Sequence, residues 1–313
     1  MKVTRFHDTP LIHSGLHPSI GDNINGPCLI QVPEWVSNPL GRYYLYFAHH
    51  KGRSIRLAFA DQLTGPWQVH EPGALALEDS FFAQSDLAPG GSIWGAHSSD
   101  DDHIAHIASP DVIIDHGAKL FRMYFHGLLE DGDQQTRLAV STDGLTFTTQ
   151  PQLLGPPYFR VFDHGGFVYA VSWGGICQRS NDWPGPFETG QCLLNVEADG
   201  KERTIRHVAV FVKGDMLNLF FSCIGDCPEA ILVSQIDLTG DWRGWSASEP
   251  KLLLQPKLAW EGALLQLEPS KVGTSANPEH ALRDPYVFES DGEYYILYTG
   301  SGEQGIGIAR LEF

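Results

Sequence analysis

The segment Tyr43–Trp67 reads YYLYFAHHKGRSIRLAFADQLTGPW and contains two strand-like stretches around a short polar turn. The first stretch is aromatic and aliphatic and ends at His49 and His50, and the second ends in Gly-Pro-Trp. Aromatic and β-branched runs bounded by turn residues predict a β-hairpin. The pair of histidines at the tip of this hairpin suggests that the tip has a chemical role.

The same hairpin pattern returns four more times along the chain. A short apolar strand precedes each of the five hairpins, and no stretch predicts a long helix. Five units of four strands predict an all-β fold, a five-bladed β-propeller with four antiparallel strands in each blade. The four further hairpins begin with KLFRMYFHG (119–127), GFVYAVSWGG (166–175), DMLNLFFSCIG (215–225) and EYYILYTGSG (293–302).

We expect residues 1–313 to form a single propeller domain. The fifth unit has only three strands before Phe313, so its outer edge needs a partner. We predict that the N-terminal segment, residues 1–15, supplies this strand and closes the ring. Two connections, 71–108 and 250–283, are long, and insertions of this length tend to be functional. The expected blades are 22–73, 104–154, 156–194, 204–254 and 280–313.

The composition excludes some partners. The formal net charge is −17 with 21 basic residues, which argues against nucleic acid, for which a basic surface is expected, and against anionic membrane surfaces. No apolar run is long enough for a membrane span. The N-terminus MKVTRFHDTPLIH lacks an apolar signal core, so a cytoplasmic location is expected if Met1 is the true start. The oligomeric state stays open.

One end of the propeller axis is the predicted site. In each blade the start of the innermost strand and the turn between the second and third strands face the same end. Three of the residues at these positions are Asp111, His207 and Asp284, which we predict to be catalytic from the resemblance described below. The predicted substrate-binding residues are Asn25, His49, His50, Arg53, His126, Arg160, Trp173, Arg283 and Glu303, with Glu261 on a long connection.

From about residue 20 to 313 the sequence resembles the five-bladed propeller glycosidases, glycoside hydrolase family 43 and its relatives in families 32, 62, 68 and 117. The stretches that carry the resemblance are Tyr43–Trp67, ASPDVIID with RMYFHG, and LRDPYVFESDGEYYILYTGSGEQGIGIA. The resemblance implies hydrolysis of glycosidic bonds by carboxylates around the axis. Such motifs are more specific for the fold than for the activity.

The sequence departs from that family at two catalytic positions. The first inner strand of those enzymes usually starts with Asp-Pro, but here Gly26 precedes Pro27, with Asn25 and Asp22 nearby. The fourth blade usually offers a Glu as acid, but TIRHVAVF offers His207. A histidine has been assigned the acid role in family 117. An Asp-Pro pair does occur, at Asp284, but in the fifth unit.

Glycoside hydrolysis needs a proton donor for the leaving oxygen and a base or nucleophile on the other side of the ring. A histidine with an ordinary pKa of about 6.5 can supply the proton. We therefore expect His207 to act as the acid, with Asp111 or Asp284 as the base, on a small oligosaccharide attacked from its end. The alternatives are a polysaccharide lyase, in which His207 or Tyr158 takes a proton and an arginine neutralises a uronate, and a non-catalytic sugar-binding propeller.

Fourteen histidines are many for this length. One interpretation is sugar recognition, with Trp173 or Trp94 stacking on a sugar face. Another is a calcium or zinc ion in the axial pocket, since neutral imidazole is a common ligand. The acidic run SSDDDH (98–103) is either a solvated loop or part of an ion site. The sequence alone does not choose between the two ions or identify the sugar.

Overall fold

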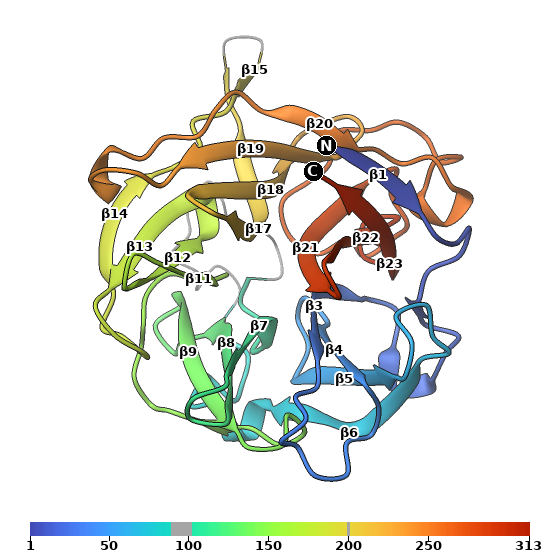
Figure 1. Ribbon diagram of the computed structural model, residues 1–313. Helices are drawn as coiled ribbons and strands as arrows, with labels where there is room; N and C mark the ends of the chain where they lie inside the picture. The colour runs from blue at the N-terminus through green and yellow to red at the C-terminus, as the bar shows by residue number, and fades with distance from the viewer. Residues whose placement is uncertain (89–101, 199–200) are drawn as a thin grey trace.

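The computed structural model describes residues 1–88, 102–198 and 201–313. Figure 1 looks along the axis and shows five β-sheets arranged around it, each with one strand nearest the centre. Every sheet is antiparallel. In four of the five blades the strands follow the chain order from the centre outward. The prediction of an all-β, five-bladed propeller with four strands per blade is confirmed.

The strands have the following bounds, given from the innermost strand outward. Blade one consists of β3 (Asn25–Gln31), β4 (Tyr43–Ala48), β5 (Ser54–Ala60) and β6 (Gln68–Ala76). Blade two consists of β7 (Ile107–Asp115), β8 (Leu120–Leu128), β9 (Gln134–Ser141) and β10 (Thr148–Thr149). Blade three consists of β11 (Arg160–His164), β12 (Phe167–Ser172), β13 (Ile176–Ser180) and β14 (Glu188–Cys192). Blade four consists of β17 (Thr204–Lys213), β18 (Met216–Ile224), β19 (Ile231–Asp237) and β20 (Lys251–Leu254).

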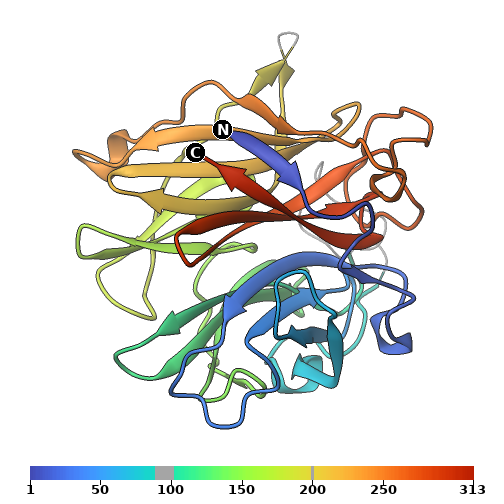
Figure 2. The same cartoon turned by 45° about the vertical axis from the view of Figure 1, so that its right-hand side comes forward.

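Blade five combines the two ends of the chain. Its inner strands are β21 (Leu282–Ser290), β22 (Glu293–Gly300) and β23 (Gly305–Glu312). The outer edge of β23 pairs with β1 (Lys2–Arg5) and with the short β2 (Ile12–His13). Figure 2 shows β1, in blue, lying against the red C-terminal strand. The expected closure by the N-terminal segment is therefore confirmed.

Outside the blades, the described residues contain a short hairpin of β15 (Glu197–Ala198) and β16 (Lys201–Glu202). They also contain single turns of 3-10 helix, and no helix among them is long and apolar enough to cross a membrane. The helical turns are η1 (Pro18–Ile20), η2 (Leu77–Asp79), η4 (Trp173–Gly175), η5 (Trp242–Gly244) and η6 (Ala259–Glu261).

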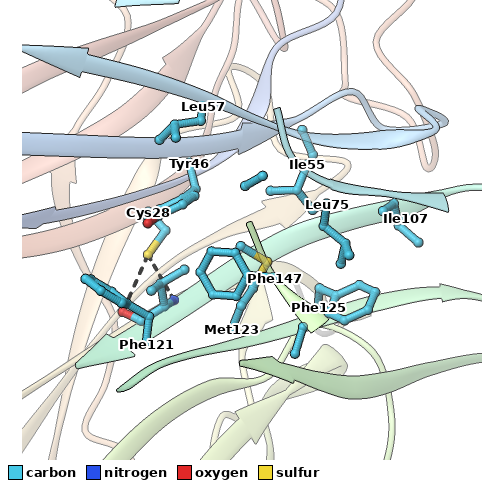
Figure 3. Packing of buried hydrophobic residues seen from close by; sticks show 14 of the residues in the cluster. Cys28, Tyr46, Ile55, Leu57, Leu75, Ile107, Phe121, Met123, Phe125 and Phe147 are labelled. Carbon is cyan, nitrogen blue, oxygen red and sulfur yellow. Dashed lines mark hydrogen bonds between the residues drawn. The ribbon is translucent and has the colours of Figure 1, made fainter. Parts of the chain in front are cut away.

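The blades pack face to face through aromatic and aliphatic side chains. Figure 3 shows the layer between blades one and two, where Tyr46 and Phe147 meet edge to face with ring centroids 5.9 Å apart. In the same layer the Cys28 sulfur accepts a hydrogen bond from the Val112 backbone N–H at 3.1 Å. Both faces of a blade are covered by neighbours, so the middle strands are almost continuously buried. All six residues of β4 are buried. This packing holds the inner strands rigidly around the axis.

The inner strands share an irregular start. In four of the five blades the pairing of the inner strand with its neighbour is interrupted by a bulge near the axis. Gly26, Ser109 and Asp284 lie in these bulges with φ of 58°, 51° and 48°, and Tyr158, just before β11, has a φ of 67°. Left-handed backbone is costly for the three residues that are not glycine, and such strain gathers at functional sites.

Candidate active site

Five residues from the starts of the inner strands form a ring around the axis, which we call the axial ring: Gly26, Ser109, Tyr158, His207 and Asp284. A Cβ atom at Gly26 would lie 3.1 Å from Ser109 Cα, and the Gly26 N–H faces Asp284 Oδ2 at 3.4 Å. Asp284 pairs with His207, whose ring centroid is 4.4 Å from that of Tyr158. Four contacts thus join the five residues, and one residue comes from each blade.

A small cavity of about 40 Å³ opens beside the axial ring. This volume holds a few water molecules and is smaller than a sugar ring. His207 and Tyr158 form part of its wall, and two of the predicted substrate-binding residues, His50 and Trp173, also line it. The remaining lining residues are Asp102, Gln134, Arg206, Ile224, Val272 and Gly273.

His207 and Asp284 form a buried pair. His207 Nδ1 contacts Asp284 Oδ1, and the Asp284 side chain is fully buried. Burial, Arg206 and His50 hold the pKa of His207 well below its usual value, and Glu303 opposes this shift only in part. The imidazole is therefore neutral at neutral pH, with Asp284 placed to orient it. A neutral histidine supported by a carboxylate accepts a proton more readily than it donates one.

Tyr158 lies between two imidazoles. Its ring centroid is 4.1 Å from that of His126 and 4.4 Å from that of His207. Burial and the neighbouring His106 and His207 hold the pKa of His126 well below its usual value. Neither ring nitrogen of His126 has a hydrogen-bond partner among the described residues. The two flanking rings restrict the orientation of Tyr158 at the cavity wall.

Behind the cavity lies a row of buried side chains in which two glutamates alternate with two arginines and a histidine, the charge belt: Arg206, Glu229, Arg283, Glu303 and His50. Glu229 accepts hydrogen bonds from Arg206 Nε at 2.8 Å and Arg283 Nε at 3.0 Å. Glu303 Oε1 lies 3.5 Å from Arg283 Nη1 and 3.2 Å from His50 Nδ1. Burial raises the pKa of both carboxyl groups, but the cations beside them more than offset it, so both pKa values lie below normal. Both glutamates are therefore ionised, and the belt ties blades four, five and one together.

Arg206 also fixes one wall of the cavity. Its Nη2 donates to the Lys271 carbonyl at 2.5 Å, and its Nη1 faces the Gly273 carbonyl at 3.5 Å. Because Val272 and Gly273 line the cavity, the long connection 255–281 reaches the site as expected. The position of this connection in the cavity wall depends on Arg206, whose guanidinium is fixed by hydrogen bonds to Glu229.

Several predicted residues lie away from the cavity. Asp111 is buried beside the axial ring and is not part of it. Its Oδ2 accepts a hydrogen bond from the Val161 N–H at 2.8 Å, and burial raises its pKa. Arg160 Nη1 lies 4.0 Å from Asp111 Oδ1 and donates to the Pro110 carbonyl at 2.9 Å. Both residues join blades two and three, and Ser109, two residues before Asp111, takes the position at the axis.

Two further predicted residues have structural partners instead. Glu261 is fully buried under the N-terminal strand, where Arg5 binds it with two hydrogen bonds of 2.6 and 2.8 Å. Arg53 is half-exposed and contacts Glu78 and the Gln84 carbonyl on the surface. The structure therefore does not bring Glu261 or Arg53 to the cavity.

The remaining predicted residues lie at the rim of the ring. Asn25 is buried opposite Ala48 at the start of β3. His49 is half-buried, with Nε2 3.9 Å from Asp22 Oδ1, whereas its neighbour His50 turns inward to Glu303. Trp94, His97 and the first part of the acidic run 98–103 lie outside the described residues.

Sequence reasoning missed Gln134, Arg206 and Glu229, and it named Asp102 only as a member of the acidic run 98–103. A signal for Glu229 exists in the repeat: it lies two residues before β19, as Glu303 lies two residues before β23. Asp102 lines the cavity and pairs with Lys51 at 3.4 Å. It is the only carboxylate among the described lining residues.

The calcium or zinc ion that the histidines suggested stays a prediction, because part of the acidic run 98–103 lies outside the described residues. Among the described residues, no three side chains of His, Cys, Asp or Glu are arranged to hold a metal ion. His50 and His207 are each occupied by a carboxylate of their own. We therefore derive no step through a metal.

The comparisons with known proteins place the chain in a family. No family model matches it. It is 36% identical over 334 residues to the uncharacterized protein R118 of Acanthamoeba polyphaga mimivirus, with 99% of this chain and 90% of the relative covered. The chain belongs to the family of R118.

Solved structures place this R118 family in a known fold. A family-43 β-xylosidase/α-arabinofuranosidase from a compost microbial metagenome, in complex with xylotriose, matches with a TM-score of 0.62 at 12% identity, over 99% of this chain and 95% of that one. A family-43 enzyme from Xanthomonas citri complexed with xylose matches with a TM-score of 0.61 at 13% identity, over 97% and 89%. The chain has the five-bladed propeller fold of these glycosidases, as its sequence resemblance predicted.

Proposed function

We propose that this protein hydrolyses a glycosidic bond of a small neutral oligosaccharide at the axial cavity. The observation that carries the proposal is the buried His207–Asp284 pair in the cavity wall, on a propeller fold shared with glycosidases. The small volume beside His207 suits water, the co-substrate of hydrolysis. The sugar would lie at the cavity mouth, with its chain end against the wall that Arg206 holds.

The proposed step begins with neutral His207. It takes a proton from a cavity water whose oxygen attacks the anomeric carbon, while Asp284 stabilises the imidazolium that forms. The bond from that carbon to the glycosidic oxygen breaks, and the leaving oxygen needs a proton. Among the described lining residues, Tyr158 has a hydroxyl proton that can be supplied, whereas Asp102 is paired with Lys51. The direction of proton transfer is thus the reverse of the acid role expected for His207 from sequence.

Elimination by a lyase is less well supported. That reaction needs an arginine free to neutralise a uronate carboxylate. Arg160 donates to a backbone carbonyl beside Asp111, and Arg283 is fully buried between Glu229 and Glu303. Arg206 does line the cavity, but Glu229 occupies its guanidinium with two hydrogen bonds.

A product assay tests the proposal. The wild-type protein is incubated with a panel of plant and algal oligosaccharides, and products are analysed by mass spectrometry and ultraviolet absorbance. Hydrolysis adds one water and a new reducing end, whereas elimination gives an unsaturated product without added water. The His207→Asn variant should lose the activity, and His116→Asn, at an exposed hairpin turn, is the matched control. An active His207→Asn variant, unsaturated products, or binding of the sugars without cleavage would each contradict the proposal.

A further inference from the structure

A second groove lies on the side of the molecule between blades one and two. It has a volume of about 800 Å³, within the range of about 300–1,000 Å³ that holds small ligands. On one side it is formed by η2 and the residues that follow, and on the other by the outer edge of blade two around β10. None of its lining residues belongs to the axial cavity. They are Glu78, Asp79, Phe81, Phe82, Gln84, Thr146, Phe147, Thr148 and Thr149.

Phe81 is the unusual residue of this groove. Its backbone has a φ of 59°, a left-handed conformation that is rare for a bulky side chain, and 58% of the residue is exposed. Left-handed backbone in a residue other than glycine costs about 1–3 kcal/mol. More than half of the residue is left exposed to solvent in return. A strained, exposed aromatic residue is therefore an indication of binding.

The surroundings hold Phe81 in this conformation. The Ser80 hydroxyl donates to the Leu77 carbonyl at 2.6 Å and accepts the Phe82 N–H at 3.2 Å. Arg137 Nη2 donates to the Phe81 carbonyl at 3.0 Å, and its guanidinium lies over the buried Phe82 ring. Both neighbours of Phe81 are thus anchored, and its side chain is left to face solvent.

The polar groups around the ring define the ligand chemistry. Asp79, Glu78, Thr146 and Thr148 are all exposed, and carboxylates and hydroxyls of this kind pair with the hydroxyls of a sugar. An aromatic face beside them suits the apolar face of a sugar ring. The lining itself contains two carboxylates and no lysine or arginine. Arg53 pairs with Glu78 from beside the groove, so Asp79 is the carboxylate that disfavours acidic polymers.

We propose that this groove is a separate binding site for a neutral polysaccharide chain, with Phe81 as its stacking platform. The ligand class follows from the chemistry of the groove itself and does not depend on the proposed hydrolysis. A site of this kind holds the protein on a polymer while the axial cavity acts on chain ends.

Phe81→Gly is the decisive variant, because glycine accepts a positive φ without strain. If the ring serves only the fold, its removal lowers the melting temperature. If it serves binding, the variant melts at or above the wild-type temperature and loses the polymer. The retained-ring variant Phe81→Tyr should bind as the wild type does. Leu264→Gly removes an exposed apolar side chain elsewhere, 84% exposed, and is the matched control.

The binding assay is native gel electrophoresis in gels containing soluble xylan, arabinan or galactan, with polygalacturonate as the acidic polymer. We expect at least one neutral polymer, and not the acidic one, to retard the wild type, Phe81→Tyr and Leu264→Gly. Phe81→Gly should bind about tenfold more weakly or worse, as for a central aromatic contact. Its turnover of short oligosaccharides should equal that of the wild type, and His207→Asn should still be retarded.

Three results would overturn the proposal. The first is an absence of retardation of the wild type by every neutral polymer. The second is equal retardation of Phe81→Gly. The third is a change from dimer to monomer on Phe81→Gly in light scattering, which would make the groove a contact between copies of the chain. A groove that binds in a protein without hydrolytic activity would contradict the proposed function alone.

Discussion

The buried ion pair between Arg5 and Glu261, which we call the clasp, allows a quantitative prediction for the stability of the variant Arg5→Ala. Arg5 lies on β1, the strand that completes blade five, and Glu261 ends η6 in the long connection. The guanidinium makes a two-pronged contact with a carboxylate that is fully buried. Removal of Arg5 leaves that charge in place without its cation.

The expected loss of stability is about 3 kcal/mol. Breaking a buried ion pair on one side costs about 3–5 kcal/mol. Glu261 keeps three neutral donors, the N–H groups of Lys257 and Leu258 and the Tyr298 hydroxyl, at 2.7, 3.0 and 2.8 Å. The Arg5 side chain is 16% exposed. Both facts favour the lower end of the range. For a chain of this size, about 2 °C per kcal/mol gives a melting temperature about 6 °C lower.

Urea unfolding and calorimetry measure this change. The control is Lys2→Ala on the same strand, whose Nζ lies 4.0 Å from Glu312 with side chains 73% and 50% exposed. An exposed pair of this kind contributes at most about 1 kcal/mol. If Arg5→Ala costs no more than Lys2→Ala, the clasp does not stabilise the ring, and the reasoning fails.

The pH dependence of the same difference has a definite sign. Burial raises the pKa of Glu261, but Arg5 and the backbone N–H groups outweigh it and hold this pKa below the ordinary value of 4.5. A lowered folded-state pKa stabilises the fold above the unfolded value, and this stability is lost as pH falls through the folded value. The gap between wild type and Arg5→Ala should therefore be full at neutral pH and shrink below pH 4.5.

Three further predictions concern the cavity. If His207 is the base, its lowered pKa keeps it neutral, so kcat/KM should stay constant as pH falls from neutrality to 6.5, the ordinary pKa of histidine, and decline only below it. A decline centred at or above pH 6.5 contradicts the assignment. Asp284→Asn should lower kcat by about 10²- to 10⁴-fold with little change in KM, since it removes the partner of the base and leaves the wall intact; a change confined to KM would assign it to binding. Tyr158→Phe should lose activity on natural sugars yet keep it on dinitrophenyl glycosides, whose leaving group needs no proton. Asp102→Asn, in the same wall, should not show this difference between the two substrates; an equal loss on both substrates for Tyr158→Phe would exclude Tyr158 as the donor.

The sequence predicts the fold well because each blade of the propeller is encoded by a local pattern of strands and turns. Apolar strands and polar turns repeat five times, and a three-stranded last unit requires an outer partner. The pairing Thr4↔Arg310 confirms that inference across the whole chain. Strand patterns report burial on both faces, which is the condition of every blade in this fold.

The site is harder to predict because its geometry depends on bulges and long-range pairs. The bulge between Ala108 and Asp111 adds residues to one strand, so the alternation of faces cannot be followed through it. Ser109 therefore reaches the axis, and Asp111 turns to blade three. Glu261 looks like a loop residue, but its partner Arg5 is 256 residues away. Local sequence carries no sign of such a contact.

The pairing of β1 with β23 has a consequence for biosynthesis. Of the strands in the structure, β1 leaves the ribosome before all the others, whereas its hydrogen-bonding partner β23, Gly305–Glu312, leaves after all the others. Until then the outer edge of β22 in blade five is unpaired and exposed to other nascent chains. A transcript that stops before Gly305 would yield four complete blades and a β1 that has nothing to pair with.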